Sequence, residues 1–171
     1  MIASKYISMT NNAKLTIQYI IDLEGEYVNN PKDPGGETKY GISKRAFPNL
    51  DIKNLTEDDA FEIYYKKYYL PNASFLEKLP ETLRKKFFAL GINAGFKQAF
   101  LCLQRALRNE VPTLAEDGVF GANSQKALNQ VVNWQAILYA FNSETAAFYR
   151  LCAIKNGNTF LKGWLNRAYH K

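Results

Sequence analysis

The arrangement of hydrophobic and polar residues along the chain is mostly that of amphipathic helices. Between residues 13 and 24, apolar side chains recur three and four positions apart, and Glu24 lies at the end of the apolar face that includes Ile17 and Ile21. We therefore expect a mainly α-helical fold. The same spacing predicts further helices from residue 56, from residue 80, over residues 98–108, after residue 121, over residues 135–155 and over residues 160–169.

Two segments depart from the helical pattern. Residues 28–36 contain two prolines, two glycines and two asparagines, which predicts an irregular loop. The residues that follow are suited to a short extended segment, and we expect one small β-hairpin near residues 37–43. The helix from Thr56 opens on a capping box, Thr56-Glu57-Asp58-Asp59, and Pro71 is expected to end it.

The position of Glu24 has a chemical consequence. A carboxylate on the apolar side of a helix loses hydration, which disfavours its charged form unless it is paired. A glutamate that keeps its proton near neutral pH can act as a general acid on a glycosidic oxygen. A carboxylate that only frays out of the helix end, or meets a basic partner, fits the same periodicity, so position alone does not establish catalysis.

The residues that follow Glu24 add a more specific indication. Residues 24–42, EGEYVNNPKDPGGETKYGI, closely resemble the signature of glycoside hydrolase family 108, a family of lysozyme-like N-acetylmuramidases. The resemblance implies that Glu24 is the essential acid, which protonates the leaving oxygen of the β-1,4 bond between N-acetylmuramic acid and N-acetylglucosamine. It also implies that Asp33 is the second catalytic carboxylate and that Thr38 holds a water molecule. For Asp33, an Asx turn ahead of a proline is the alternative.

Three further residues are candidates for substrate binding. Tyr27 and Tyr40 lie inside the signature and are suited to stacking on a sugar ring or positioning it. Asn93, near the predicted end of a helix, can bond an N-acetyl group of the glycan or cap the helix before Gly95.

The sequence also departs from the family pattern. Glu26 stands where the family usually has a second glycine, and Ala89 stands where a later motif, FDxxxNxG, has its aspartate. These departures support an alternative function, that of a catalytically weak, lysozyme-like murein-binding scaffold or a secretion-associated protein.

The second half of the chain resembles a different module. Leu103-Gln104-Arg105-Ala106-Leu107, the turn Asp117-Gly118-Val119-Phe120-Gly121 and Gly163-Trp164-Leu165-Asn166-Arg167 are similar to motifs of the peptidoglycan-binding region that accompanies this hydrolase family. We expect a catalytic part over residues 1–95 and a helical peptidoglycan-binding part over residues 96–171, packed as one compact unit. The resemblances together imply an endolysin-like peptidoglycan hydrolase.

Composition narrows the expected partners. The 171 residues include 22 Lys and Arg and 16 Asp and Glu, a net charge of +6, which favours encounter with a polyanionic envelope. We expect peptidoglycan glycan strands as the partner and, without a recognised motif, no nucleic acid. The chain has one histidine, His170, and two cysteines, too few for a His-based zinc or iron site, so we expect no metal and no cofactor.

The sequence also bears on location. The longest apolar runs are about five residues, far shorter than the roughly 20 that span a bilayer, so we expect no stable membrane insertion. Residues 1–14 contain no apolar segment typical of a signal peptide. We expect a monomer made in the host bacterial cytoplasm that reaches the cell wall or periplasm after release, for example through a holin.

Overall fold

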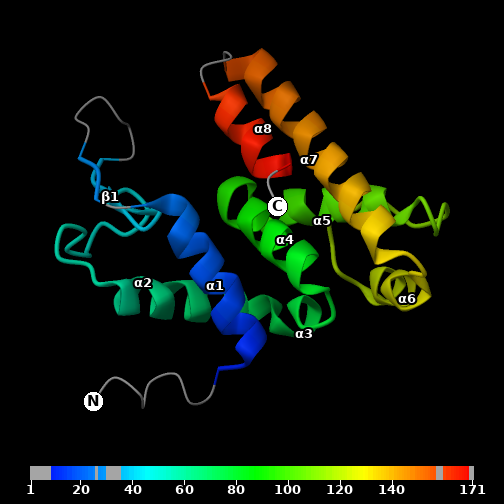
Figure 1. Cartoon of the computed structure of the whole chain (residues 1–171), viewed down its shortest axis with the longest axis horizontal. Helices are drawn as coiled ribbons and strands as arrows, with labels where there is room; N and C mark the ends of the chain where they lie inside the picture. Colours follow the sequence, from blue (N-terminus) through cyan, green and yellow to red (C-terminus); the bar gives the residue numbers. More distant parts are fainter. Residues whose placement is uncertain (1–8, 26, 30–35, 157–159, 170–171) are drawn as a thin grey trace. The chain divides into compact units, whose positions relative to one another are not determined.

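A computed structural model describes residues 9–25, 27–29, 36–156 and 160–169 (Figure 1). The chain divides into two compact units, Met1–Glu77 and Lys78–Lys171. The described elements are helical except for one two-stranded sheet. The structure therefore confirms the predicted mainly α-helical fold with one small hairpin.

The first unit begins with helix α1 (Asn11–Glu24). The hydroxyl oxygen of Thr10 accepts a hydrogen bond from the backbone N–H of Ala13 at 3.1 Å, so the helix starts two residues earlier than its apolar pattern does. Ile17 is buried on the inner face of α1, as predicted. Gly25 ends the helix with φ of 72°, a backbone conformation that favours glycine.

The hairpin consists of strands β1 (Thr38–Lys39) and β2 (Ile42–Ser43), which pair in antiparallel register with Thr38 opposite Ser43. The two turn residues between the strands both have positive φ, 51° at Tyr40 and 75° at Gly41. Positive φ at both residues is the pattern of a type I′ turn, whose backbone twist matches the right-handed twist of the two strands that it joins. The small sheet thus lies where the sequence predicts it.

The next helical segment is longer than expected. Helix α2 (Glu57–Tyr64) begins with the predicted capping box, in which Thr56 Oγ1 accepts from Asp59 N at 3.1 Å. The expectation that Pro71 ends this helix was wrong. Helical turns continue through a π-helical turn, η1 (Tyr65–Tyr69), a 3-10 turn, η2 (Leu70–Asn72), and helix α3 (Ala73–Leu76). Pro71 lies in the first turn of η2, where its missing N–H breaks no bond of that turn.

The carboxylate of Glu77 links the start of α1 to η1 by hydrogen bonds. It accepts hydrogen bonds from Thr10 Oγ1 at 2.5 Å, from Asn12 Nδ2 at 2.6 Å and from the Tyr69 hydroxyl at 2.9 Å. The cap of α1 and the π-helical turn therefore share one acceptor. Because hydrogen bonds to charged groups are stronger than neutral ones, this contact fixes the start of α1 against η1.

In its described residues the second unit contains helices joined by loops and no strand. Its helices are α4 (Glu81–Ala94), α5 (Phe96–Leu107), α6 (Ala122–Gln130), α7 (Trp134–Asn156) and α8 (Leu161–Tyr169). Helix α5 packs on α4 and α7, and α8 runs back along the end of α7 (Figure 1). At the centre, the Phe87 ring meets Phe100 edge-on with ring centres 4.9 Å apart.

Both cysteines are free thiols, Cys102 buried and Cys152 half-buried. Among the described residues, none of the helices combines the length and the hydropathy required to cross a bilayer.

Candidate active site

Glu24, the predicted acid, is the last residue of α1, and its side chain lies against the hairpin turn. A Cβ atom added at Gly41 would come within 2.8 Å of Glu24 Cγ and 3.1 Å of Glu24 Cβ. The half-buried Glu24 side chain therefore packs directly on the backbone of Gly41. Only a residue without a side chain allows this approach, so the glycine of the signature has a spatial reason to be there.

Tyr64 completes this contact from the other side. Its side chain is 1% exposed, and its hydroxyl donates a hydrogen bond to the Tyr40 carbonyl at 2.8 Å. The added Cβ atom at Gly41 would also lie 2.6 Å from that hydroxyl. The end of α1, the hairpin turn and α2 thus meet around Glu24, Gly41 and Tyr64.

Tyr40 is held in an unfavourable backbone conformation. Its φ of 51° lies in the left-handed region, which costs a non-glycine residue roughly 1–2 kcal/mol. Two hydrogen bonds hold it there, one from Tyr40 N to the Gly25 carbonyl at 3.1 Å and one from the Tyr64 hydroxyl at 2.8 Å. Strained residues of this kind gather at functional sites. The turn is therefore anchored to the residue that directly follows Glu24.

Thr38 and Tyr27 are brought to the same hairpin. The backbone of Thr38 exchanges two hydrogen bonds with Val28, at 2.8 and 2.9 Å. The Tyr27 hydroxyl hydrogen-bonds the carboxylate of Glu37, the residue before β1. Loss of hydration, followed by the negative charge of Glu37, raises the pKa of Tyr27 above its ordinary value. Tyr27 therefore keeps its proton near neutral pH.

The remaining candidates lie elsewhere. Asp33, and with it Glu26, falls outside the described residues. Asn93 lies on α4 in the second unit, where it is exposed and donates from Nδ2 to the Ala89 carbonyl at 2.9 Å. Gly95, with φ of 87°, ends this helix, so Asn93 is not its cap. Contact between Asn93 and glycan stays a prediction.

Sequence reasoning missed the roles of Tyr64 and Glu37. Tyr64 is buried. A buried tyrosine hydroxyl needs a hydrogen-bond partner, which was the available signal. Its partner is a backbone carbonyl 24 residues earlier in the chain, and no local pattern indicates that pairing.

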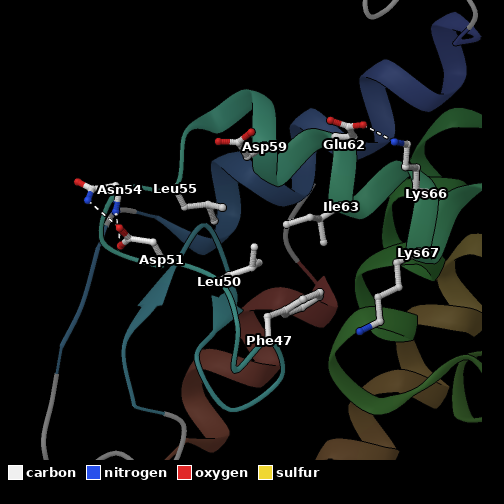
Figure 2. Close-up of a pocket in the computed structure, with 10 residues that line it drawn as sticks. All are labelled: Phe47, Leu50, Asp51, Asn54, Leu55, Asp59, Glu62, Ile63, Lys66 and Lys67. Atoms are coloured by element: carbon white, nitrogen blue, oxygen red, sulfur yellow. Dashed lines mark hydrogen bonds and ion pairs between the residues drawn. The ribbon is translucent and has the colours of Figure 1, made fainter.

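A groove of about 600 Å³ also lies in the first unit, between residues 47–55 and the helical segment of α2 and η1 (Figure 2). Its charged groups are already engaged with neighbours. Asn54 Nδ2 donates to Asp51 at 2.8 Å, Lys66 pairs with Glu62, and the Lys67 ammonium lies 4.0 Å from the centre of the Phe47 ring. None of the catalytic or sugar-binding candidates lines this groove.

The structure explains one motif of the second unit. The Gln104 amide donates to Asp117 Oδ1 at 2.7 Å and accepts from the Gly118 N–H at 2.8 Å. The hydrogen bond from Gln104, reinforced by the backbone N–H of Val119, lowers the pKa of Asp117. One glutamine of α5 therefore holds the Asp-Gly turn that leads into α6. Among the described residues, the acidic, His and Cys side chains form no group of three that could hold a metal ion.

Comparisons with known proteins relate both halves of the chain to described families. Residues 17–95, which contain Glu24, the hairpin and Tyr64, match the family model described as glycosyl hydrolase 108. This part of the chain belongs to the glycosyl hydrolase 108 family. Residues 98–169 match the model described as a predicted peptidoglycan domain. A search of curated proteins found no match to the chain.

Among solved structures, the chain is similar to one described as the structure of Brucella abortus SagA. The TM-score is 0.72 and the sequence identity 27%, and the match covers 91% of this chain and 88% of that one. The fold is therefore lysozyme-like, as the sequence predicts. The two family matches make the chain a glycoside hydrolase directed at peptidoglycan.

Proposed function

We propose that this glycosyl hydrolase 108 protein is an N-acetylmuramidase that cleaves the β-1,4 bond between N-acetylmuramic acid and N-acetylglucosamine. The observation that carries the proposal is the packing of Glu24 on Gly41, inside the segment that matches the hydrolase family. The turn of this hairpin is hydrogen-bonded to Gly25 and to Tyr64. The Glu24 side chain therefore packs on a turn that is held in place. A fixed carboxyl group is what proton transfer to a glycosidic oxygen requires.

In this mechanism Glu24 gives its proton to the leaving oxygen as the glycosidic bond breaks. Positive charge develops on the sugar ring in an oxocarbenium-like transition state. Asp33 stabilises that charge or activates the attacking water, and Thr38, at the start of the hairpin, holds the water. Tyr40, in the hairpin turn, and Tyr27, bonded through its hydroxyl to Glu37, position the sugar.

The first test replaces Glu24 by a residue that has no acidic proton. In Glu24→Gln the shape of the side chain is kept and the acid is lost, so clearing of a purified murein suspension is expected to fall about 100- to 10,000-fold. Asp22→Asn is the matched control, because Asp22 is an exposed carboxylate of the same helix turn, bonded by Gln18 at 3.0 Å. Unchanged clearing in Glu24→Gln, with unchanged clearing in the control, would contradict the proposal.

The second test separates the two readings of Asp33. Asparagine forms an Asx turn as readily as aspartate, so Asp33→Asn preserves a turn and removes only the negative charge. A loss of clearing of about 100-fold or more, with an unaltered unfolding midpoint, is expected for a catalytic carboxylate. Full clearing by this variant would leave Asp33 a turn residue.

The bond specificity is read from the products. A muramidase leaves N-acetylmuramic acid at the new reducing end. Reduction of the digest followed by sugar analysis is therefore expected to show N-acetylmuramic acid converted to its sugar alcohol. Reduced N-acetylglucosamine would indicate a glucosaminidase, and a 1,6-anhydro end a transglycosylase. Either result contradicts the proposed cleavage.

A second candidate function is a murein-binding scaffold with weak catalysis. Ala89 favours this function, because the family motif has an aspartate at this position and the chain has no carboxylate there. Ala89 is buried, with 3% of its surface exposed. A scaffold sediments with murein and does not clear it, whereas the proposed enzyme clears it. Endolysin-type release through a holin stays a prediction.

A further inference from the structure

The positive charge of the chain is concentrated at its C-terminal end. From Thr145 to Lys171 the sequence contains five of the 22 Lys and Arg residues and none of the 16 Asp and Glu residues. This segment therefore carries five of the chain's six net positive charges. Its described residues include the last turns of α7 and the whole of α8, which lie side by side (Figure 1).

Large apolar side chains are exposed at the same end of this helical pair. Leu151 is 59% exposed, Ile154 79% and Phe160 65%. Leu151 and Ile154 are three residues apart on α7, so they share one helix face, and both lie within about 8 Å of the helix end along its axis. Phe160 directly precedes α8. We call these residues, with the exposed cations Arg150, Lys155 and Lys162, the α7–α8 tip.

The tip is exposed although the helical pair is already packed. Tyr149 of α7 stacks on Trp164 of α8 with ring centres 5.6 Å apart. Buried Lys86 of α4 donates to the Ala168 carbonyl of α8 at 3.0 Å. These contacts use the inner faces of the two helices and leave Leu151 and Ile154 outside. The Phe160 ring lies with its centre 6.0 Å from that of Trp164 and is still 65% exposed. Exposed apolar side chains that gather at one place, ringed by charge, are typical of an interaction surface.

We propose that the α7–α8 tip binds the surface of a membrane rich in anionic phospholipids. Lipid phosphates attract Arg150, Lys155 and Lys162, while Leu151, Ile154 and Phe160 enter the boundary between headgroups and acyl chains. A polyanionic wall polymer would bind the cations and would not need the apolar residues. A second copy of the chain would bind the apolar residues and would not need a segment without acidic residues. The combination favours lipid. The binding is peripheral and reversible.

The proposal is tested with the full chain and lipid vesicles. The protein is sedimented with vesicles of phosphatidylglycerol mixed with phosphatidylcholine, and with vesicles of phosphatidylcholine alone. Binding to the anionic vesicles only, weakening as salt is raised, is expected because screening shortens the reach of the cations. Absence of binding to the anionic vesicles overturns the proposal.

Variants assign that binding to the tip. Replacing Leu151, Ile154 and Phe160 together by serine is expected to weaken vesicle binding more than about tenfold. The matched control is the double variant Val132→Ser and Tyr139→Ser, which removes side chains 90% and 64% exposed near the start of α7, outside the acid-free segment. The control is expected to bind like the wild type, and an equal loss in the control overturns the proposal.

A charge variant provides an independent measurement. Lys155→Gln with Lys162→Gln is expected to weaken binding to anionic vesicles about 25-fold, or about fivefold for each charge. The unfolding midpoints of the serine and glutamine variants are expected to equal that of the wild type, which shows that they fold. Vesicle sedimentation uses no murein, which keeps this test separate from that of Glu24. If the serine variant keeps vesicle binding and instead loses sedimentation with murein or self-association on gel filtration, the tip serves that other partner and the proposal fails.

Discussion

At the scale of single residues, the packing of the site requires a glycine at position 41. Gly41 has no Cβ, and the space that a Cβ would fill is taken by the Glu24 side chain and the Tyr64 hydroxyl. The φ of 75° at Gly41 adds a second requirement for glycine. One residue therefore sets both the shape of the turn and how closely α1 and α2 approach it.

Gly41→Ala is expected to damage stability and activity together. The left-handed backbone alone costs alanine roughly 1–2 kcal/mol, and the contacts with Glu24 and Tyr64 add to this. The free energy of unfolding from urea titration and the rate of murein clearing measure the two effects. Gly163→Ala is the control for stability, because Gly163 lies in α8 with no atom near its Cβ position, where alanine is expected to stabilise by up to about 1 kcal/mol. An unfolding free energy of Gly41→Ala equal to that of the wild type would contradict this account.

At the scale of elements, side chains fix where the helices begin and how the loops between them lie. Thr10 and Thr56 cap α1 and α2. Helix α2 starts where its capping box predicts, whereas α1 starts two residues before its apolar pattern. The connection after α5 is held by ion pairs, since Glu116 accepts from Arg105 Nε at 2.9 Å and from Arg108 Nη1 at 2.5 Å. Glu116 therefore binds the loop back to the helix that precedes it.

This pair of contacts predicts a pH dependence. Hydrogen bonds from Arg105 and then Arg108 lower the pKa of Glu116 below its ordinary value of 4.5. A carboxylate with a lowered pKa in the folded state stabilises the protein above the pKa of the unfolded chain, and this contribution is lost as pH falls through the folded value. Glu116→Gln is therefore expected to lower the unfolding midpoint slightly at neutral pH, because surface pairs contribute little.

The difference between the wild type and Glu116→Gln is expected to shrink below about pH 4.5 and to disappear in stronger acid. Thermal unfolding followed by circular dichroism at neutral and acidic pH measures it. A difference that grows as the pH falls would mean that Glu116 does not stabilise the loop as a carboxylate.

At the scale of the whole molecule, family matches and packing divide the chain at different places. The hydrolase match ends at residue 95 and the peptidoglycan match begins at residue 98, close to the boundary that the motifs predict. The compact units divide instead between Glu77 and Lys78. Helix α4 matches the hydrolase family by sequence and packs with α5 and α7. A functional boundary at residue 95 stays a prediction.

The sequence by itself determined the helices, the hairpin, the family and the candidate acid. Periodicity, caps and turn residues act between near neighbours in the chain, and these interactions are present in the order of the residues. Even so, local rules failed at Pro71, because a change to π and 3-10 turns let the chain remain helical there.

Only the tertiary structure decided what surrounds the acid. Glu24, Gly41 and Tyr64 come from three elements, and the bond from Tyr64 to Tyr40 joins residues 24 positions apart. Such contacts form when buried faces pack and each buried polar group must find a partner. For the same reason the exposure of Leu151, Ile154 and Phe160 became visible only after the helices were packed, since any of these apolar residues could equally have been buried.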